Sequence, residues 1–411
     1  MRTLKLTALI LMLFAHAAMA QNWVYDNHVY RPYIKTVQCY NTRAEQSFPL
    51  INLQNNEQLL LAFDDLQGSV KNFYYTVEHC DATWQKSNLS PVEYLDGITE
   101  DRINDYRYSF NTLQKYTHYE IRLPNMNIRP KLAGNYLLKV YENNDQNQPV
   151  LSQRFYVLNQ KAGVAVQLAP SMQMNTRNTN QKLNIRVQTG GLPVQNPYAE
   201  IRVLAMQNMR NDVAQLTSRP QFVRNGELLY TDVSSNDYPG GNEFRRIDMR
   251  SFRSPGEHVY TIRKDSANVI TLYKDHSRNG QAYSNRPDNN GAFFIRNLDG
   301  RDPRTDADYA WVDFLFEGPN EGDLYVVGQF DHYRLNPANA LSYDASQNGY
   351  TGKIMLKQGV YDFMYRYAGK SPFALEGSFF QTQNEYQVLV YYKAVTARWE
   401  ELVGFSQIGT R

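Results

Sequence analysis

The sequence has little cysteine and tryptophan and no large excess of charge of either sign. It contains two cysteines and four tryptophans in 411 residues, and 43 lysines and arginines stand against 41 aspartates and glutamates. A balanced charge argues against a nucleic-acid partner and against an electrostatic hold on anionic lipid. Beyond residue 20, the sequence also has no apolar run long enough for a membrane-spanning helix.

Residues 1–20 have the pattern of a cleavable export signal. Arg2 and Lys5 precede an apolar run that ends at Phe14, and Ala-Met-Ala follows at 18–20. Signal peptidase accepts small residues one and three positions before the cut, so we expect cleavage after this tripeptide and a mature chain in the periplasm. That chain carries 41 basic and 41 acidic residues. No cysteine lies near the cut, so we expect no acylated-cysteine lipid anchor.

The two cysteines, Cys39 and Cys80, leave two alternatives open. In an oxidising compartment the pair can form a disulfide. Closing a loop of about 40 residues would then stabilise the fold by roughly 3–4 kcal/mol in the chain-entropy model. The other alternative is a pair of buried free thiols that act as small apolar residues.

Apolar and polar residues alternate with a period of two in many short segments, and long helical periodicity is missing. The expected strands lie at 57–63, 72–79, 119–123, 135–141, 182–187, 200–203, 259–263, 311–316, 323–330 and 385–392. Turn-rich stretches separate them at 142–149, 235–242, 285–291 and 346–349. Many short strands with regular turn signals predict an all-β protein of tandem immunoglobulin-like or E-set β-sandwich domains.

A weak internal repeat suggests three such domains. A glycine followed closely by a tyrosine at the start of a strand occurs at Tyr136, Tyr260 and Tyr361, which lie 124 and 101 residues apart. Many sandwiches fix a corner through a bond from such a tyrosine hydroxyl to the backbone. The expected domains are an N-terminal sandwich at 21–160, a middle sandwich with long polar loops at 161–303 and a C-terminal E-set-like sandwich at 304–411.

No strong catalytic motif is present. The sequence has no Gly-x-Ser-x-Gly elbow, Walker loop, dinucleotide fingerprint or His-Glu-x-x-His motif. No histidine of the mature chain has a histidine partner at metal-ligand spacing. The acidic pairs 64–65 and 400–401 are interpreted as solvated surface charges rather than as a glycosidase pair. We therefore predict a protein that is not an enzyme and has no catalytic, cofactor or metal residues.

The segment 242–253 is the most unusual in the chain, because four arginines are interleaved with four apolar residues. Arginine and aromatic residues are enriched in protein interfaces, which makes this segment a candidate partner contact. An equally open alternative is a strand whose arginines pair with acids of its own domain. The candidate contact residues are Phe244, Arg245, Arg246, Arg250, Phe252 and Arg253.

Short motifs are spread along the mature sequence in a characteristic order. They lie at 34–38, 74–81 with Trp84, 93–97, 240–248, 274–275, 288–291, 309–312, 376–378 and 384–386. Together and in this order, they resemble the plug protein family of the type IX secretion system.

That resemblance implies a function by occlusion. In this family the protein sits at the periplasmic mouth of the SprA-type outer-membrane translocon barrel and seals the pore when no cargo is in transit. A stack of rigid β-domains suits this task, since it is bulky and needs no chemistry. Because cargo must displace the plug, we expect a wet interface of moderate area. The resemblance brings no catalytic residues and no small-molecule substrate.

The third expected domain also resembles the small sandwich modules that bind glycogen or precede glucan-branching catalytic domains. The residues that carry this likeness are Gly328, Gln329, Phe330, Gly349, Tyr350, Leu356, Gly359, Tyr361 and Tyr365. Those modules usually place a tryptophan just after the Gly-x-Phe, where this chain has Tyr333. The alternative function is thus a periplasmic or surface glycan-binding protein, although we favour a shared fold over a shared ligand.

Overall fold

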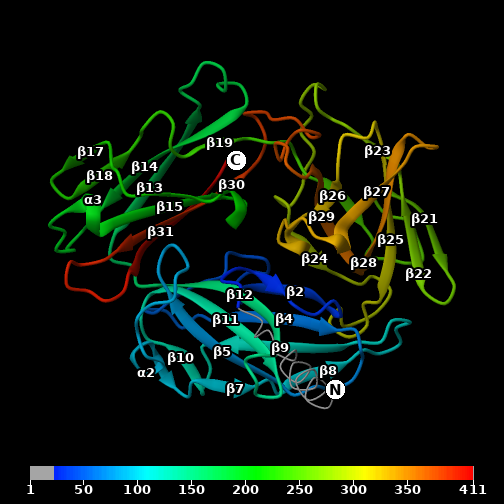
Figure 1. Cartoon of the computed structure of the whole chain (residues 1–411), viewed down its shortest axis with the longest axis horizontal. Coiled ribbons are helices and arrows are strands. Elements are labelled where there is room, and N and C mark those ends of the chain that lie inside the picture. The colour runs from blue at the N-terminus through cyan, green and yellow to red at the C-terminus, as the bar shows by residue number, and fades with distance from the viewer. Residues whose placement is uncertain (1–22, 411) are drawn as a thin grey trace, which may run out of the picture.

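The computed structural model describes residues 23–410, whose regular secondary structure is almost all β-strand and is gathered in three lobes (Figure 1). Lobe 1 comprises residues 23–160, lobe 2 comprises 163–239 together with 385–409, and lobe 3 comprises 245–367. In Figure 1 they lie at the bottom, the upper left and the upper right. Each lobe encloses an apolar core of its own. The predicted export signal lies outside the described residues.

Lobe 1 consists of two large sheets packed face to face and one small two-stranded sheet. Its elements are β1 (His28–Val29), β2 (Ile34–Asn41), β3 (Leu50–Asn52), β4 (Leu59–Asp65), β5 (Phe73–Cys80), α2 (Pro91–Tyr94), β6 (Leu95–Gly97), β7 (Glu100–Arg102), β8 (Asp105–Tyr108), β9 (Thr117–Leu123), β10 (Ile128–Pro130), β11 (Gly134–Glu142) and β12 (Pro149–Leu158). One sheet has the order β1-β12-β11-β5-β7, with β3 beside β12, and the other has the order β2-β4-β9-β8. Strand β4 is buried along its whole length, which explains its almost continuous apolar sequence.

Lobe 2 is also built from two sheets. Its elements are β13 (Gly163–Pro170), β14 (Asn180–Gln188), α3 (Pro197–Glu200), β15 (Ile201–Gln207), η1 (Asn211–Val213), β16 (Gln215–Thr217), β17 (Phe222–Arg224), β18 (Glu227–Tyr230), β19 (Asp237–Pro239), β30 (Glu385–Tyr392) and β31 (Glu401–Gly409). The first sheet has the order β13-β14-β18-β17, with β19 on β14, and the second has the order β16-β15-β30-β31. The Asn-Gly turn between β17 and β18 has two positive φ angles, of 37° and 81°, as tight hairpins require.

Lobe 3 is one continuous path of strands wrapped around its core. Its elements are β20 (Arg245–Asp248), β21 (Val259–Lys264), β22 (Asn268–Leu272), β23 (Asp275–His276), β24 (Phe293–Ile295), β25 (Tyr309–Glu317), β26 (Leu324–Val327), η2 (Gln329–Asp331), η3 (Pro337–Asn339), β27 (Ala340–Asp344), β28 (Gly349–Lys357) and β29 (Gly359–Tyr367). The strand order is β20-β29-β26-β27-β28-β25-β22-β21, with β24 on β29 and β23 on β25.

The structure divides the second half of the chain differently from the sequence-based domains. Strands β20–β24 belong to lobe 3, although they precede the expected boundary at residue 304. Strands β30 and β31 return to lobe 2, where β30 pairs with β15 over seven residues. Lobe 3 is therefore inserted into lobe 2. Side-chain alternation reports which face of a strand is buried, but it does not report which sheet the strand joins.

The expected strands are confirmed, except that the one expected at 323–330 ends at Val327 and is followed by η2. Two of the three tyrosine corners are confirmed as well. The hydroxyl of Tyr136 donates to the carbonyl of Leu132 at 2.8 Å, and that of Tyr361 donates to the carbonyl of Lys357 at 2.7 Å. Tyr260 is 60% exposed instead, and it forms no such corner. The Gly-Tyr pattern thus marks one tyrosine corner in lobe 1 and one in lobe 3. Tyr260 does not mark a further domain, because it also lies in lobe 3.

The two cysteines are free. Cys39 lies on β2 and Cys80 lies on β5, which belong to the two different sheets of lobe 1. Burial raises the pKa of each thiol to about 12, so both stay protonated at neutral pH. Of the two alternatives for this pair, the structure has the free thiols and not the disulfide.

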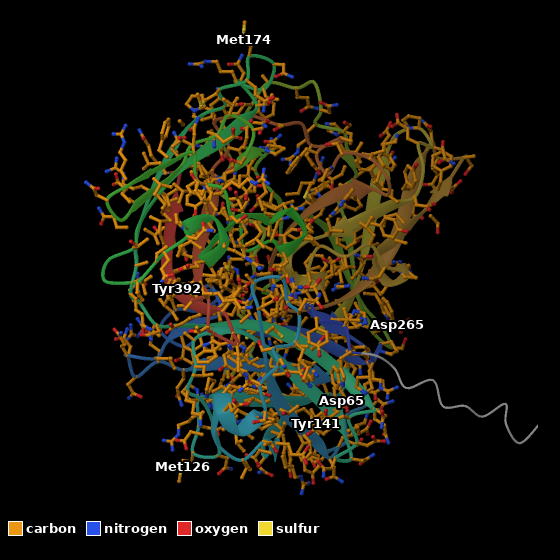
Figure 2. The ribbon with its side chains drawn as sticks, turned by 60° about the vertical axis from the view of Figure 1, so that its left-hand side comes forward. Asp65, Met126, Tyr141, Met174, Asp265 and Tyr392 are labelled. Atoms are coloured by element: carbon orange, nitrogen blue, oxygen red, sulfur yellow. The ribbon has the colours of Figure 1, made fainter. Side chains whose placement is uncertain are left out.

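The three lobes meet in the middle of the molecule and point their loop tips outward. Met126 of lobe 1 and Met174 of lobe 2 lie at opposite ends of the molecule (Figure 2). These two side chains are 92% and 96% exposed, whereas the charged clusters described next lie deep between and within the lobes.

Candidate functional site at the junction of the three lobes

A buried carboxylate joins lobe 1 to lobe 3. Asp64, on β4, is fully buried. Its Oδ2 accepts a hydrogen bond of 2.7 Å from Lys357 Nζ and another of 2.7 Å from the hydroxyl of Tyr309. His118 Nδ1 lies 2.6 Å from Asp64 Oδ1. We call these four residues the Asp64 cluster. The interpretation of the pair 64–65 as solvated surface charge is therefore wrong.

The ionisation of this cluster follows from burial and pairing. Burial alone raises the pKa of Asp64, but Lys357 and His118 outweigh it and hold this pKa below its ordinary value. The pKa of His118 is raised, because its hydrogen bonds to Asp64 and Glu120 outweigh burial. The hydrogen bond from His118 is the main reason that the pKa of Glu120 falls to about 2. The cluster thus places cations beside anions, as a stable buried charge requires.

The rest of this interface is polar as well. The hydroxyl of Tyr116 donates to the carbonyl of Ala307 at 2.8 Å, and the Nζ of Lys357 lies 4.1 Å from the centre of the Tyr116 ring. At the rim, Arg296 of lobe 3 pairs with Glu45 of lobe 1 at 2.5 Å. Directed contacts of this kind fix the orientation of two lobes more than they add net stability.

The interface between lobes 1 and 2 has the opposite character. Its buried residues are mainly apolar and aromatic: Phe48, Leu50, Cys80, Ala82, Trp84, Leu137, Tyr156, Leu158, Leu204, Met206, Leu389, Tyr391 and Leu402. Directed bonds accompany them, among them one from Tyr391 to Asn135 and one from the backbone of Ala82 to Glu400, both at 2.8 Å. Glu400 is 3% exposed, so the interpretation of this acid as solvated is also wrong.

A second buried cluster surrounds Arg245, on β20. Its guanidinium pairs with Asp275 at 2.5 Å and with Glu376 at 3.0 Å. Arg278 also binds Glu376, and His258 binds Asp275, at 2.7 and 3.0 Å. The motifs at 240–248, 274–275 and 376–378 therefore meet in space, although they lie far apart in the sequence. The opposite charges explain why an arginine can lie here with 9% exposure.

This cluster corrects part of the predicted contact surface. Phe244 and Arg245 are both 9% exposed, so neither forms a surface for a partner. Phe244 packs in a small apolar group with Val327, Tyr333 and Met364. The alternative of a strand whose arginines pair within its own domain describes Arg245 correctly.

The other four candidate residues lie nearer to solvent. Arg246 lies 3.9 Å from Glu257, and Arg250 pairs with Asp248 at 2.6 Å. Phe252 packs partly against the core of lobe 3. Arg253 is the most exposed of the four arginines, with 80% of its side chain accessible and Asp299 at 3.7 Å.

Three acids of lobe 3 have raised pKa values because they are buried. Burial raises the pKa of Asp331 and Asp362 to about 7 and that of Asp288 to about 6. Backbone N–H groups donate to each of them, and those of Asn289 and Gly291 donate to Asp362 on β29. These acids hold the loops of lobe 3 in place. Within residues 23–410, no group of three or more His, Cys, Asp or Glu side chains is placed to hold a metal ion.

Tyr333, the residue at the position of the sugar-stacking tryptophan, does not present its ring to solvent. It is 6% exposed, and the guanidinium of Arg210 covers the ring at 4.4 Å. A polysaccharide on the outer surface of lobe 3 cannot stack on it.

The fold and the buried clusters define an all-β protein of three interlocked lobes. Residues 34–159 match the family model for the first domain of type 9 secretion system plug proteins. In these residues, the chain is similar to type 9 secretion system plug proteins. This family suggests a non-catalytic protein that is associated with the cell envelope and with the secretion machinery.

The whole fold also occurs in a solved structure. The crystal structure of a hypothetical protein from Parabacteroides merdae ATCC 43184, at 2.30 Å resolution, has a TM-score of 0.90 and 29% sequence identity to the chain. The likeness covers 95% of this chain and 100% of that one. None of the curated proteins matches the chain. Within the described residues, no helix is both long and apolar enough to cross a membrane.

Proposed function

We propose that the protein is a periplasmic plug of the type IX secretion system. It docks at the periplasmic opening of the SprA-type outer-membrane translocon and seals the pore in the absence of cargo. The match of residues 34–159 to the first domain of plug proteins carries this proposal. The protein works by filling space and has no reaction to catalyse.

The arrangement of the lobes supports such a role. A pore wide enough for folded cargo leaks unless a body of comparable width fills its mouth. Lobe 1 contacts lobe 2 through an apolar interface and lobe 3 through the Asp64 cluster, so the three lobes act as one body. Interfaces that are buried and closely packed resist relative motion of the lobes.

The decisive experiment measures ion conductance through the purified translocon barrel in a planar bilayer. We expect the mature protein to lower the conductance in proportion to the amount added, and excess cargo to restore it. A barrel that passes ions equally well with and without the protein would contradict the proposal.

A charge reversal locates the docking face. Arg253 is the most exposed arginine of the segment 242–253, so Arg253→Glu should weaken the block if this segment contacts the barrel. Arg224→Glu, on the exposed strand β17 of lobe 2, is the matched control with the same change of charge. Equal blocking by both variants would place the docking face elsewhere on the protein.

A further inference from the structure

Within residues 23–410, six ion pairs join lobe 3 to the other two lobes, and five of them have the same polarity. In these five the cation belongs to lobe 3 and the acid belongs to lobe 1 or lobe 2: Lys357–Asp64, Arg304–Glu120, Arg296–Glu45, Arg334–Asp26 and Arg366–Asp212. The sixth pair, Arg107–Asp302 at 4.0 Å, is reversed. Lobe 3 thus docks through a cationic face onto an acidic one, as two partner proteins of complementary charge do.

Apolar packing contributes less to this docking than to the contact between lobes 1 and 2. The buried apolar clusters of lobe 3 contain residues between 244 and 375 and none from the other two lobes. Lobes 1 and 2 share such a cluster instead, which includes Trp84 and Leu389. Interfaces between domains permit relative motion unless they are large and hydrophobic, so lobe 3 is held less firmly than lobes 1 and 2 hold each other.

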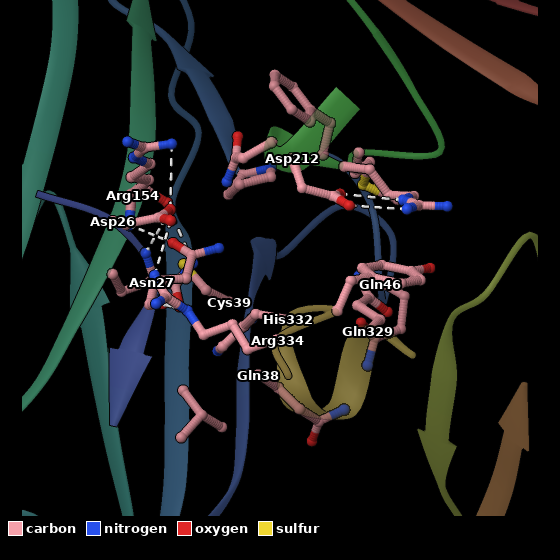
Figure 3. A pocket seen from close by; sticks show the side chains of 18 of the residues that line it. Asp26, Asn27, Gln38, Cys39, Gln46, Arg154, Asp212, Gln329, His332 and Arg334 are labelled. Carbon is pink, nitrogen blue, oxygen red and sulfur yellow. Dashed lines mark hydrogen bonds and ion pairs between the residues drawn. The ribbon is translucent and has the colours of Figure 1, made fainter. Parts of the chain in front are cut away.

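The acids that bind lobe 3 also have cations on their own lobe. Figure 3 shows this for Asp26, in the pocket where the three lobes meet, which lies between Arg154 of its own lobe and Arg334 of lobe 3, at 3.1 and 2.7 Å. Asp212, on the other side of this pocket, pairs with Arg210 of its own lobe at 2.8 Å. Each of these two acids thus keeps a partner when lobe 3 leaves.

The same arrangement occurs around the Asp64 cluster. Asp64 has His118 of its own lobe at 2.6 Å, and Glu120 has Arg122 of its own lobe at 2.9 Å. Glu45, the fifth acid, is 29% exposed and is solvated without its partner on lobe 3. Separation of lobe 3 therefore leaves no acid both buried and unpaired, which is the main penalty for breaking buried ion pairs.

Two connections tie lobe 3 to lobe 2, residues 240–244 and residues 368–384. Both bond to the same carbonyl of lobe 2, that of Thr179. The N–H of Gly240 donates to it at 2.8 Å, and the hydroxyl of Ser378 donates to it at 2.9 Å. Lobe 3 therefore has a single pivot, and it stays tethered close to its docking faces, which makes docking again fast and favourable.

We propose that lobe 3 is a releasable unit of the fold. It undocks from lobes 1 and 2 as a folded body, turns on the pivot at Thr179 and docks again, while lobes 1 and 2 stay joined. Salt shifts the balance towards the released form, because it weakens the attraction between the two charged faces. That release loosens the body that blocks the pore is a consequence that rests on the proposed function, whereas the release itself rests on the contacts above.

Distances between spin labels on the mature protein test the release. The labels are attached at exposed tips through Met126→Cys in lobe 1, Met174→Cys in lobe 2 and Asp265→Cys in lobe 3 (Figure 2). Cys39 and Cys80 are buried thiols that stay protonated at neutral pH, so they react poorly with the label.

We expect a single narrow distance between the labels of lobes 1 and 3 at low salt, and a second, longer population at high salt. The distance between the labels of lobes 1 and 2 should stay single and narrow under both conditions. The far-UV circular dichroism, measured in sodium fluoride, should not change, because the released lobe stays folded.

The double variant Arg334→Gln with Arg366→Gln removes two docking cations and leaves their acids paired on their own lobes. At a given salt concentration, it should raise the ratio of released to docked molecules about tenfold. The matched control is Arg253→Gln with Arg263→Gln, which removes two exposed arginines of lobe 3 that form no ion pair with another lobe in the described part of the chain. This control should keep the ratio of the wild type.

Three results would overturn the proposal. The first is a distance between lobes 1 and 3 that stays single and narrow at high salt in both the wild type and the Arg334→Gln, Arg366→Gln variant. The second is equal release in that variant and in the control. The third is a simultaneous change of the distance between lobes 1 and 2 or a loss of the circular dichroism signal, since salt would then unfold the molecule rather than release one lobe. None of these results bears on pore sealing, which the conductance measurement tests separately.

Discussion

Lobe 1 is joined to its two neighbours by interfaces of opposite chemistry. Against lobe 2 it buries apolar side chains such as Leu389, whereas against lobe 3 it buries the charges of Asp64 and Lys357. Apolar burial stabilises in proportion to area and has no preferred direction. A buried ion pair adds little net stability. It permits only the arrangement that keeps both charges paired, because a buried charge without its partner is strongly unfavourable. The apolar interface thus holds lobe 1 and lobe 2 together, and the ionic interface sets the orientation of lobe 3 relative to lobe 1.

The largest expected effect comes from breaking the ionic interface on one side only. Lys357→Met leaves the carboxylate of Asp64 buried without its main cation, which should cost about 3–5 kcal/mol in the free energy of unfolding. Urea denaturation followed by intrinsic fluorescence measures this loss.

The double variant Asp64→Asn with Lys357→Met removes both charges and should lose much less than the single variant. The control is Lys370→Met, whose exposed pair with Glu321 should change stability by about 0.5 kcal/mol or less. A double variant that loses as much as the two single substitutions together would contradict this view of the pair.

The next largest effect comes from the apolar interface. Leu389 is fully buried on β30, so Leu389→Ala should cost roughly 2–4 kcal/mol through lost burial and the cavity that remains. Denaturation in low and high salt should give the same loss, because no charge is involved. Leu216→Ala, at a position that is 38% exposed in the same lobe, should cost far less. A loss that depends strongly on salt would contradict the contrast between the two interfaces.

Acid should weaken the ionic interface. The pKa of Glu120 is lowered to about 2 and that of Asp64 is also lowered, so their stabilisation is complete above the ordinary carboxyl range and is lost as the pH falls through the folded values. The raised pKa of His118 adds stability that is full below about 6.5 and is lost at higher pH. The cluster therefore stabilises the fold most at pH values above the ordinary carboxyl range and below about 6.5.

We expect the wild type to lose roughly 1–3 kcal/mol through this cluster between about pH 5 and pH 3. Denaturation at several pH values measures the slope. Glu120→Gln should flatten the slope, and Leu389→Ala should leave it as in the wild type. A slope that is unchanged in Glu120→Gln would show that other acids control the response.

The smallest effect is expected at the rim of the ionic interface. Arg296 and Glu45 pair at 2.5 Å, but their side chains are 45% and 29% exposed. Arg296→Ala should therefore cost only about 0–1 kcal/mol, and salt should remove the difference. Thermal unfolding at two salt concentrations suffices as the measurement. A cost as large as that of Lys357→Met would mean that depth of burial does not distinguish these pairs.

The sequence predicts the strands well because side-chain alternation is a local property. Strand β30 begins and ends where the alternation at 385–392 does. Lobe membership depends instead on pairing between distant segments, and no local pattern records that β30 pairs with β15. The same limit explains why the expected boundary at residue 304 lies inside lobe 3.

The buried clusters were missed for a related reason. Lys357 lies 293 residues from Asp64, and Glu376 lies 131 residues from Arg245, so neither pair can be recognised by spacing. One signal was available. Asp64 continues the apolar run of β4 without a turn residue between them, and an acid in such a place is more often inside an interface than in solvent. The order of the family motifs, in contrast, indicated the family whose first-domain model matches residues 34–159.

The insertion of lobe 3 into lobe 2 also sets the order in which the chain can fold during synthesis. Lobes 1 and 3 are each complete once a continuous stretch of chain has emerged. Strands β13–β19 must wait for β30 and β31, which follow lobe 3 in the chain. Until then β15 has an open edge and an exposed apolar face, which favours association with other chains. Lobe 2 is thus the last of the three lobes to mature, and a chaperone would have most to protect there.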